Sequence, residues 1–336
     1  MAHPSISMAV PLNQYYNHMK KKKILITGAS GFIGRNIFEK LSKREDLEVW
    51  GTYLTDESYK SDPKMIRADL TQKSEVYRVM QGVDVLIQGA ATTSGAKDTF
   101  NKPYYHVTDN AIVNALLYQA AHECNVSQAI FFSCTTIYPN LDRPVVESDV
   151  DLVGGIYDKY FGVGWTKIYI EKLCEFYSRL GKTKFTVIRH SNIYGPYDKY
   201  DLEKSHVFGA TITKVMTAQD NKVTVWGEGK EERDLLYISD LVDFVELVLD
   251  KQDYAFDIFN LGLEQGISIR DLVKKIVEIS GKNLNIVFDT TKPSIATKLV
   301  VDCSKAKKKF GWNQKVTLDE GIKKTLDWYK INIMNK

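Results

Sequence analysis

The 336-residue sequence has little cysteine and no long apolar run, and its charges nearly balance. Its four cysteines, Cys124, Cys134, Cys174 and Cys303, form no CxxC pair and show no metal-ligand spacing. This favours free thiols in a reducing compartment and predicts no metal site. No stretch approaches the roughly 20 apolar residues of a membrane helix, and the net charge of +3 is too small to indicate nucleic acid or a membrane surface as partner. These absences predict a cytoplasmic globular protein.

Residues 1–19 also lack a basic segment followed by a continuous apolar run, the pattern typical of a secretory signal. They are predicted to form a flexible arm ahead of the folded chain.

Short β-branched runs alternate with helical patterns from residue 22 to about 195, as in "KKILITGASGFIGRNIFEKLSK". This alternation predicts an α/β fold, a Rossmann-type doubly wound parallel sheet over residues 20–195. Beyond residue 196 the elements become shorter, which predicts a smaller C-terminal α/β substrate-binding lobe over residues 196–336, with some chain exchange between the lobes. The carboxyl ends of the parallel strands should face the cleft between the two lobes, where such sheets bind ligands.

The stretch "TGASGFIG" predicts a dinucleotide site, because it places Gly28, Gly31 and Gly34 between a strand and a helix. Glycine permits a tight turn and lets a pyrophosphate approach the N–H groups at the helix N-terminus. Asp69, after the third strand, is placed to reach the adenine edge, and Ala90 and Ala91 offer a small surface under the cofactor. The residues predicted to contact the cofactor from these stretches are Gly28, Ser30, Gly31, Phe32, Ile33, Gly34, Arg35, Asp69, Leu70, Ala90 and Ala91.

The choice between NAD and NADP stays open at this point. An acidic residue at the end of the second strand would bind a ribose 2′-hydroxyl, and an arginine would suit a 2′-phosphate. The stretch "GTYLTDES" has Thr52 or Tyr53 at that position, Asp56 lies further on, and Arg35 follows the last glycine.

From about residue 22 to 330 the chain resembles the extended short-chain dehydrogenase/reductases of the nucleotide-sugar epimerase/dehydratase type. Besides the glycine motif, the stretches that carry this resemblance are "GAA", "FFSCTTIYP", "RHSNIYGPYD", "VWGEGKEERDLLYISDL", "FNLG" and "KKKFGW". The stretches "SNIYGPYDKYDLEKSHV" and "EKLCEFY" resemble the GDP-fucose synthase-like branch. The resemblance implies NAD or NADP as cofactor, a nucleotide-sugar substrate (a GDP-sugar first) and a homodimer.

The resemblance also implies roles for single residues. Lys167 matches the catalytic lysine that binds the nicotinamide ribose, and Asn110 matches an asparagine beside the active site that also adjoins the cofactor. His206 matches a histidine used as an acid or base by the epimerising reductases. The residues implied to bind the substrate are Asn192, His206, Lys214, Trp226 and Arg233.

Three positions depart from the pattern of the family. Val163 occupies the place of the catalytic tyrosine, four residues before Lys167, and a valine supplies no proton to a carbonyl that is being reduced. Cys134 stands where the family has a serine or threonine, and a thiol is a poorer hydrogen-bond donor. Thr136 stands where the epimerising relatives have a cysteine. The Asp-Glu pair of the dehydratases is displaced by "CTT", so dehydration is not expected.

Several residues are candidates to replace the tyrosine. Tyr160 lies seven residues before Lys167 and would share its face on a continuous helix, although Gly162 and Gly164 leave open where that helix begins. His206 has an ordinary pKa suited to proton transfer, and the two threonines can donate a hydrogen bond. The predicted catalytic set is therefore Lys167, His206, Cys134, Thr135, Thr136 and Tyr160.

Three functions remain open on the sequence alone. The first is an enzyme that uses a bound nicotinamide cofactor for 4-keto reduction or epimerisation of a nucleotide sugar. The second is a catalytically degenerate subunit that binds cofactor or sugar nucleotide and regulates a partner. The third is an epimerase that abstracts a proton from a 4-keto sugar without redox chemistry.

Overall fold

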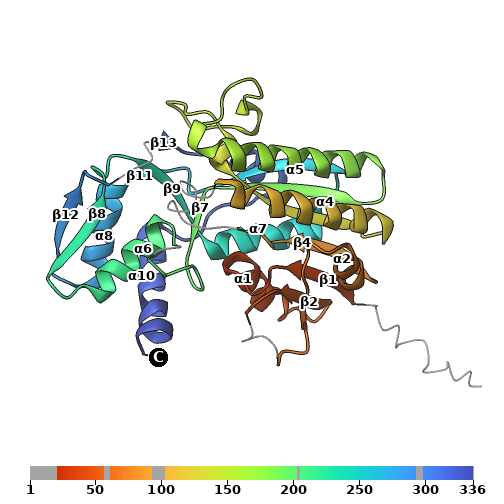
Figure 1. Cartoon of the computed structure of the whole chain (residues 1–336), viewed down its shortest axis with the longest axis horizontal. Helices are drawn as coiled ribbons and strands as arrows, with labels where there is room; N and C mark the ends of the chain where they lie inside the picture. The colour runs from red at the N-terminus through yellow and green to blue at the C-terminus, as the bar shows by residue number, and fades with distance from the viewer. Residues whose placement is uncertain (1–20, 57–60, 93–102, 203–204, 293–297, 336) are drawn as a thin grey trace, which may run out of the picture.

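The computed structural model describes residues 21–56, 61–92, 103–202, 205–292 and 298–335 of the chain. The predicted arm over residues 1–19 lies outside the described residues. Two lobes lie side by side, a larger one built on a central sheet and a smaller one at its flank (Figure 1).

The larger lobe is built on seven parallel strands in the order β10-β6-β5-β4-β1-β2-β3. This confirms the predicted Rossmann-type sheet. The strands are β1 (Lys22–Thr27), β2 (Leu47–Tyr53), β3 (Met65–Arg67), β4 (Val85–Gln88), β5 (Gln128–Cys134), β6 (Lys184–His190) and β10 (Phe256–Leu261).

Helices cover both faces of this sheet (Figure 1). The helices α1 (Phe32–Leu41) and α7 (Ile238–Lys251) cover one face, and α2 (Lys73–Met80), α4 (Thr108–Glu123) and α5 (Phe161–Arg179) cover the other. The strands are nearly continuous apolar runs, as β4 and β5 illustrate, because both of their faces are buried.

The smaller lobe joins two small sheets to several helices. Its strands are β7 (Asn192–Tyr194), β8 (Lys222–Trp226), β9 (Glu232–Tyr237), β11 (Gly266–Ser268), β12 (Asn285–Asp289) and β13 (Lys298–Leu299). Its helices are α6 (Val207–Thr217), α8 (Ile269–Ser280) and α10 (Leu318–Tyr329), and α9 (Ser304–Phe310) packs against β10.

The short helical turns of the two lobes are η3 (Pro103–His106), η4 (Thr135–Ile137), η5 (Glu147–Asp149), η6 (Asp158–Tyr160) and η7 (Lys330–Met334). Since β10 pairs with β6, chain from beyond residue 196 completes the larger sheet.

A buried ion pair ties α5 to the sheet. The guanidinium of Arg189, on β6, donates to both carboxylate oxygens of Glu171, on α5, at 3.0 and 2.7 Å, and both side chains are 5% exposed. Arg189 also donates to the Tyr138 hydroxyl at 2.9 Å, which in turn donates to Asn260 on β10 at 2.6 Å. The bidentate geometry satisfies both charges, so it fixes α5 relative to the ends of β6 and β10.

Removing one member of this pair leaves the other charge buried. Glu171→Ala should lower the free energy of unfolding by about 3–5 kcal/mol. Urea denaturation followed by circular dichroism measures this. The matched control is Lys172→Ala, because Lys172 pairs with Glu175 at the surface and should contribute less than about 1 kcal/mol. Equal effects of the two substitutions would contradict the role given to the buried pair.

Candidate active site

Two glycines of the turn after β1, Gly28 and Gly34, have no room for a side chain. A Cβ on Gly28, whose φ is +65°, would lie 2.7 Å from the Ala90 Cα, and one on Gly34 would lie 2.3 Å from the Gly28 carbonyl oxygen. Gly31 donates its N–H to that same oxygen at 2.9 Å. The glycines therefore bring the start of α1 directly against the end of β4.

The N-terminus of α1 has the features of an anion site. The helix begins at Phe32, and it has no capping side chain and no acidic residue in its first turn. Its first N–H groups therefore lack partners within the helix, which together with the helix dipole favours a phosphate there. The cradle fits the pyrophosphate of a dinucleotide. Besides the three glycines, four predicted cofactor residues lie in this turn and in the first turn of the helix, namely Ser30, Phe32, Ile33 and Arg35.

A buried network of polar side chains lies next to the glycine turn. The Gln88 side chain accepts hydrogen bonds from the Thr27 hydroxyl and from the Ala90 N–H, and donates to Asn114. The Asn110 amide donates to the carbonyls of Thr92 and His106 at 3.1 and 2.8 Å, and its oxygen accepts from the Thr92 N–H at 2.9 Å. Asn110 thus holds the segment after β4 beside the turn.

The ends of β2 and β3 form the predicted adenosine end of the cofactor site. The Thr52 hydroxyl accepts the Gly28 N–H at 3.1 Å and so braces the glycine turn. Asp69 accepts hydrogen bonds from the N–H and hydroxyl of Thr71, which lower the pKa of its carboxyl. Beside Asp69, Leu70 is buried and Ala91 is exposed. The guanidinium of Arg35 stacks over the Tyr197 ring at 3.8 Å. These contacts leave NAD and NADP both open.

Lys167 projects from α5 to the edge of β5. Its Nζ donates to the Phe132 carbonyl at 2.7 Å and lies 4.7 Å from the centre of the Phe131 ring, and burial lowers its pKa. Val163 lies one helical turn earlier on the same face and is half-buried. The lysine is therefore in place, while an apolar side chain fills the position of its expected partner.

Tyr160 lies beside the substituted position but outside α5. The helix begins only at Phe161, and Tyr160 ends the 3-10 turn η6. Burial raises the pKa of its phenol, the positive charge of Arg233 opposes that rise, and Cys134 adds to it. Tyr160 therefore lies within electrostatic range of Arg233 and Cys134, and its ring centre is 5.9 Å from that of Tyr157.

Cys134 ends β5, and its thiol is hydrogen-bonded to the Thr136 hydroxyl at 2.9 Å. Thr135 is buried, and its carbonyl accepts the N–H of Tyr138. Cys134 and Thr136 therefore form one polar pair at the carboxyl edge of the sheet.

His206 approaches from the smaller lobe, as the N-cap residue of α6. It keeps contact with solvent, yet the protein atoms around it lower its pKa, and the positive charges of Lys199 and His106 add to that effect. The imidazole is consequently neutral for the most part at neutral pH.

The structure adds His190, which was not among the predicted residues. It ends β6 as the register partner of Cys134, and its pKa responds to the charges of Lys167 and His206. His190 lies within the stretch "RHSNIYGPYD", but that resemblance gave it no role. The register of β5 and β6 shows that it lies beside Cys134.

The predicted substrate residues fall into two groups. Arg233, on β9, lies near Tyr160, and burial lowers its pKa, while Asn192 donates to the Asp234 carbonyl at 3.0 Å on the neighbouring strand β7. Lys214 donates to the Thr224 carbonyl at 3.0 Å, and its Nζ lies 5.7 Å from the centre of the Trp226 ring. Trp226 is 47% exposed at the end of β8, so it is available to stack on a ligand.

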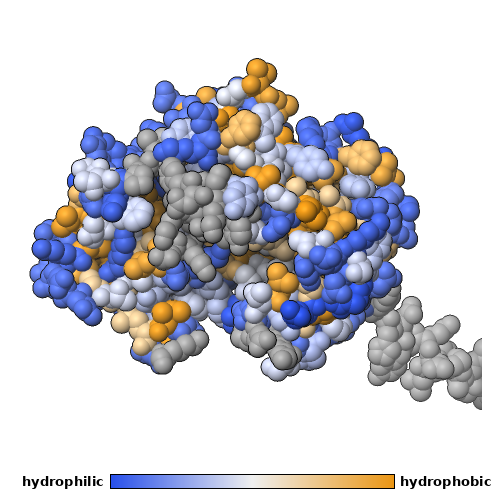
Figure 2. Space-filling view, viewed as in Figure 1, coloured by the Kyte–Doolittle hydropathy of each residue, from blue (hydrophilic) through white to orange (hydrophobic). Residues whose placement is uncertain are grey.

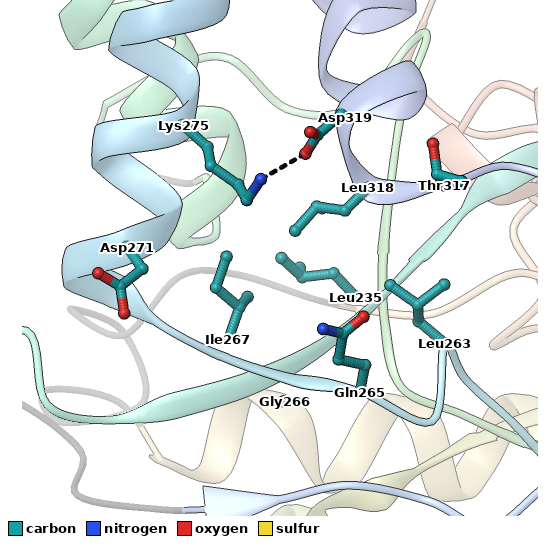
Figure 3. A pocket seen from close by; sticks show the side chains of 10 residues that line it. All are labelled: Leu235, Leu263, Gln265, Gly266, Ile267, Asp271, Lys275, Thr317, Leu318 and Asp319. Carbon is teal, nitrogen blue, oxygen red and sulfur yellow. Dashed lines mark hydrogen bonds and ion pairs between the residues drawn. The ribbon is translucent and has the colours of Figure 1, made fainter.

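A separate cavity of about 490 Å³ lies between α8, α10 and the strands β9 and β11 (Figure 3). Apolar side chains converge in it beneath the ion pair of Lys275 with Asp319, whose atoms are 2.7 Å apart. None of its lining residues is among the predicted site residues. They are Leu235, Leu263, Gln265, Gly266, Ile267, Asp271, Lys275, Thr317, Leu318 and Asp319.

Comparison with known proteins identifies the family of this chain. The model of the NAD dependent epimerase/dehydratase family matches residues 24–262. The chain belongs to this family. The family and the glycine cradle agree on a nicotinamide dinucleotide, NAD or NADP, as cofactor.

Relatives in the family align over nearly the whole chain. GDP-L-colitose synthase of Yersinia pseudotuberculosis is 29% identical, over 91% of this chain and 97% of its own length. GDP-L-fucose synthase of Escherichia coli K12 is 26% identical, over 94% and 98%. The solved structure of UDP-glucose 4-epimerase from Thermotoga maritima, with UDP-glucose, has a TM-score of 0.82 at 25% identity, over 93% of this chain and 99% of that one.

Two further findings concern the described residues alone. No helix among them is both long enough and apolar enough to cross a bilayer. Within the same residues, no cluster of three or more histidine, cysteine, aspartate or glutamate side chains is arranged to hold a metal ion.

The cradle makes a direct prediction for cofactor binding by this family member. In Gly34→Ala the added Cβ collides with the Gly28 carbonyl, so the turn has to open. The dissociation constant for NADH should rise at least about 100-fold, or about 2.7 kcal/mol. Fluorescence titration of the folded variant measures this. Gly154→Ala is the matched control, because a Cβ there meets nothing within 4 Å. Unchanged affinity in folded Gly34→Ala would contradict the site.

Proposed function

We propose that the protein modifies a nucleotide sugar, with NAD or NADP bound at the glycine cradle, by 4-keto reduction, epimerisation or both. One observation carries this proposal. Arg233 and Cys134 influence the pKa of Tyr160, and Lys167 and His206 influence that of His190, although these residues come from separate elements of both lobes. Cys134 and His190 are register partners at the carboxyl ends of β5 and β6, which supports a shared site at that edge of the sheet. That edge is where doubly wound sheets bind their ligands.

The relatives favour a GDP-sugar among nucleotide sugars. GDP-L-colitose synthase and GDP-L-fucose synthase both align with more than nine-tenths of the chain. The half-buried, positively charged Arg233 and the exposed ring of Trp226 suit a diphosphate and a base respectively.

The chain's own residues divide the proton chemistry between them. The bound nicotinamide supplies or accepts hydride. Lys167 is placed to hold its ribose, and Arg233 to pair with the substrate diphosphate. Tyr160 has a raised phenol pKa and so remains protonated at neutral pH, which suits a donor to the oxygen of a reduced carbonyl. His206, mostly neutral, suits an acid or base at a carbon beside the carbonyl.

Val163 favours one alternative, a subunit that binds cofactor and sugar nucleotide without turning them over. A non-redox epimerase of a 4-keto sugar nucleotide is the other. The deciding experiment incubates the protein with NADPH or NADH and a GDP-4-keto-6-deoxy sugar in D₂O. Cofactor oxidation supports the proposal, deuterium uptake without oxidation indicates the non-redox epimerase, and bound but unchanged ligands indicate the subunit.

The proposal includes a homodimer and a cytoplasmic location. Figure 2 shows apolar side chains over α4 and α5, and those exposed on the two helices are Ile112, Phe161, Tyr169 and Phe176. A second copy would cover them. A monomeric mass in light scattering at micromolar concentration would argue against the dimer. The four free thiols favour a reducing compartment.

Tyr160→Phe tests the assigned proton donor. It removes the hydroxyl and leaves the ring, so cofactor oxidation should slow by about 10²–10⁴-fold while the affinity for NADH stays unchanged. Single-turnover loss of reduced-nicotinamide absorbance measures the rate. Tyr157→Phe, an adjacent tyrosine in the same turn, should keep the wild-type rate. Wild-type kinetics in Tyr160→Phe would remove this residue from the mechanism.

A further inference from the structure

His190 stands at the centre of the candidate site because of strand register. Cys134 and His190 are the last residues of β5 and β6, and they are partners in the parallel ladder. Paired residues on neighbouring parallel strands project to the same face of a sheet. The imidazole therefore lies beside the Cys134 thiol, at the edge where the substrate is expected.

The ring of His190 is held in one tautomer. Its Nδ1 lies 2.7 Å from the Ser191 carbonyl oxygen. Since a carbonyl oxygen only accepts, Nδ1 carries the hydrogen and the lone pair of the neutral ring is on Nε2. Nε2 has no hydrogen-bond partner among the residues that the structure describes. By contrast, the side-chain amides of Gln88 and Asn110 beside the cofactor turn do have such partners.

The groups around His190 keep it unprotonated. The pKa of His190 is lowered to about 4, and burial is the largest cause. The charges of Lys167 on α5 and His206 on α6 lower this pKa further, whereas the hydrogen bond to Ser191 raises it. His206 in turn is influenced by Lys199 and His106. His190 is therefore a neutral base at physiological pH values, with the lone pair of Nε2 available to accept a proton.

The two imidazoles belong to opposite sides of the cleft. His190 comes from the edge of the central sheet, and His206 comes from the first residue of α6 in the smaller lobe. The charge of His206 lowers the pKa of His190, which supports a common space for the two rings between the lobes. A sugar ring placed between them would present one face to each ring.

We propose, resting on the proposed function, that His190 and His206 are an acid–base pair that inverts a carbon next to the sugar's keto group. Nε2 of His190 accepts the proton as the C–H bond breaks, and its electron pair moves into the enolate. His206 then gives a proton to the opposite face of that carbon. Solvent takes the proton from His190 and restores the one on His206, so the step is balanced without an oxidant or a reductant.

The test follows deuterium entry and inversion separately, by proton NMR of a GDP-4-keto-6-deoxy sugar with the full-length protein in D₂O. His190→Gln should slow deuterium entry at least about 100-fold with unchanged affinity for the sugar nucleotide. His206→Gln should keep deuterium entry but lose inversion, because the base remains and the opposite donor is gone. His122→Gln, on α4, is the matched control and should behave as wild type.

The pH profile adds a readout that a structural role would not change. Deuterium entry should fall as the pH drops through the pKa of His190, about 4, because the protonated ring accepts no proton. Inversion should also decline as the pH rises through the lowered pKa of His206, because its donor form is lost. His190→Gln should abolish the acid limb.

Three results overturn the pair. The first is deuterium exchange at the wild-type rate in His190→Gln, and the second is loss of exchange in this variant only together with loss of sugar-nucleotide binding. Cofactor oxidation by wild type without any deuterium entry also overturns it, while leaving the reductase of the proposed function intact. A wild-type protein that neither oxidises cofactor nor exchanges deuterium would instead refute the proposed function itself.

Discussion

The parallel register of β4, β5 and β6 is the constraint on which the site depends. It ends neighbouring strands at one edge, so Cys134 and His190, far apart in sequence, lie side by side, while Gln88 is level with Phe131 on β5. The close approach of Gly28 to Ala90 then seats α1 against the same edge. The buried pair of Arg189 with Glu171 holds α5, and therefore Lys167, at a fixed height above it.

Val163 changes what this scaffold does rather than how it folds. A half-buried valine fits the helix, and Lys167 still reaches the end of β5 through the Phe132 carbonyl. What is lost is a hydroxyl next to the lysine. In compensation, the site holds a phenol at Tyr160 and two imidazoles at His190 and His206, all with pKa values shifted by burial. Protonation of the carbonyl oxygen is therefore assigned to Tyr160, and proton transfer at the neighbouring carbon is assigned to His190 and His206.

Local patterns were sufficient for part of this picture. The strand–helix alternation predicts the central sheet, and "TGASGFIG" predicts the cofactor turn. Both predictions succeed because strands, helices and tight turns depend on residues that are adjacent in the sequence. The place of β10 in the large sheet depends on pairing with β6 over a long separation, which no local pattern carries. His190 was missed for the same reason. Tyr160 was named, but whether the helix included it depended on packing around Gly162 and Gly164, and the helix in fact begins at Phe161.

The central claim is that the family's catalytic tyrosine has been replaced by other residues and that the activity has not been lost. The most direct measurement compares wild type with Val163→Tyr for cofactor oxidation with a GDP-4-keto-6-deoxy sugar. The account predicts that wild type oxidises the cofactor and that the restored tyrosine makes it no faster, because a second donor already serves the carbonyl. A wild type that binds both ligands without reaction, together with activity in Val163→Tyr, would contradict it.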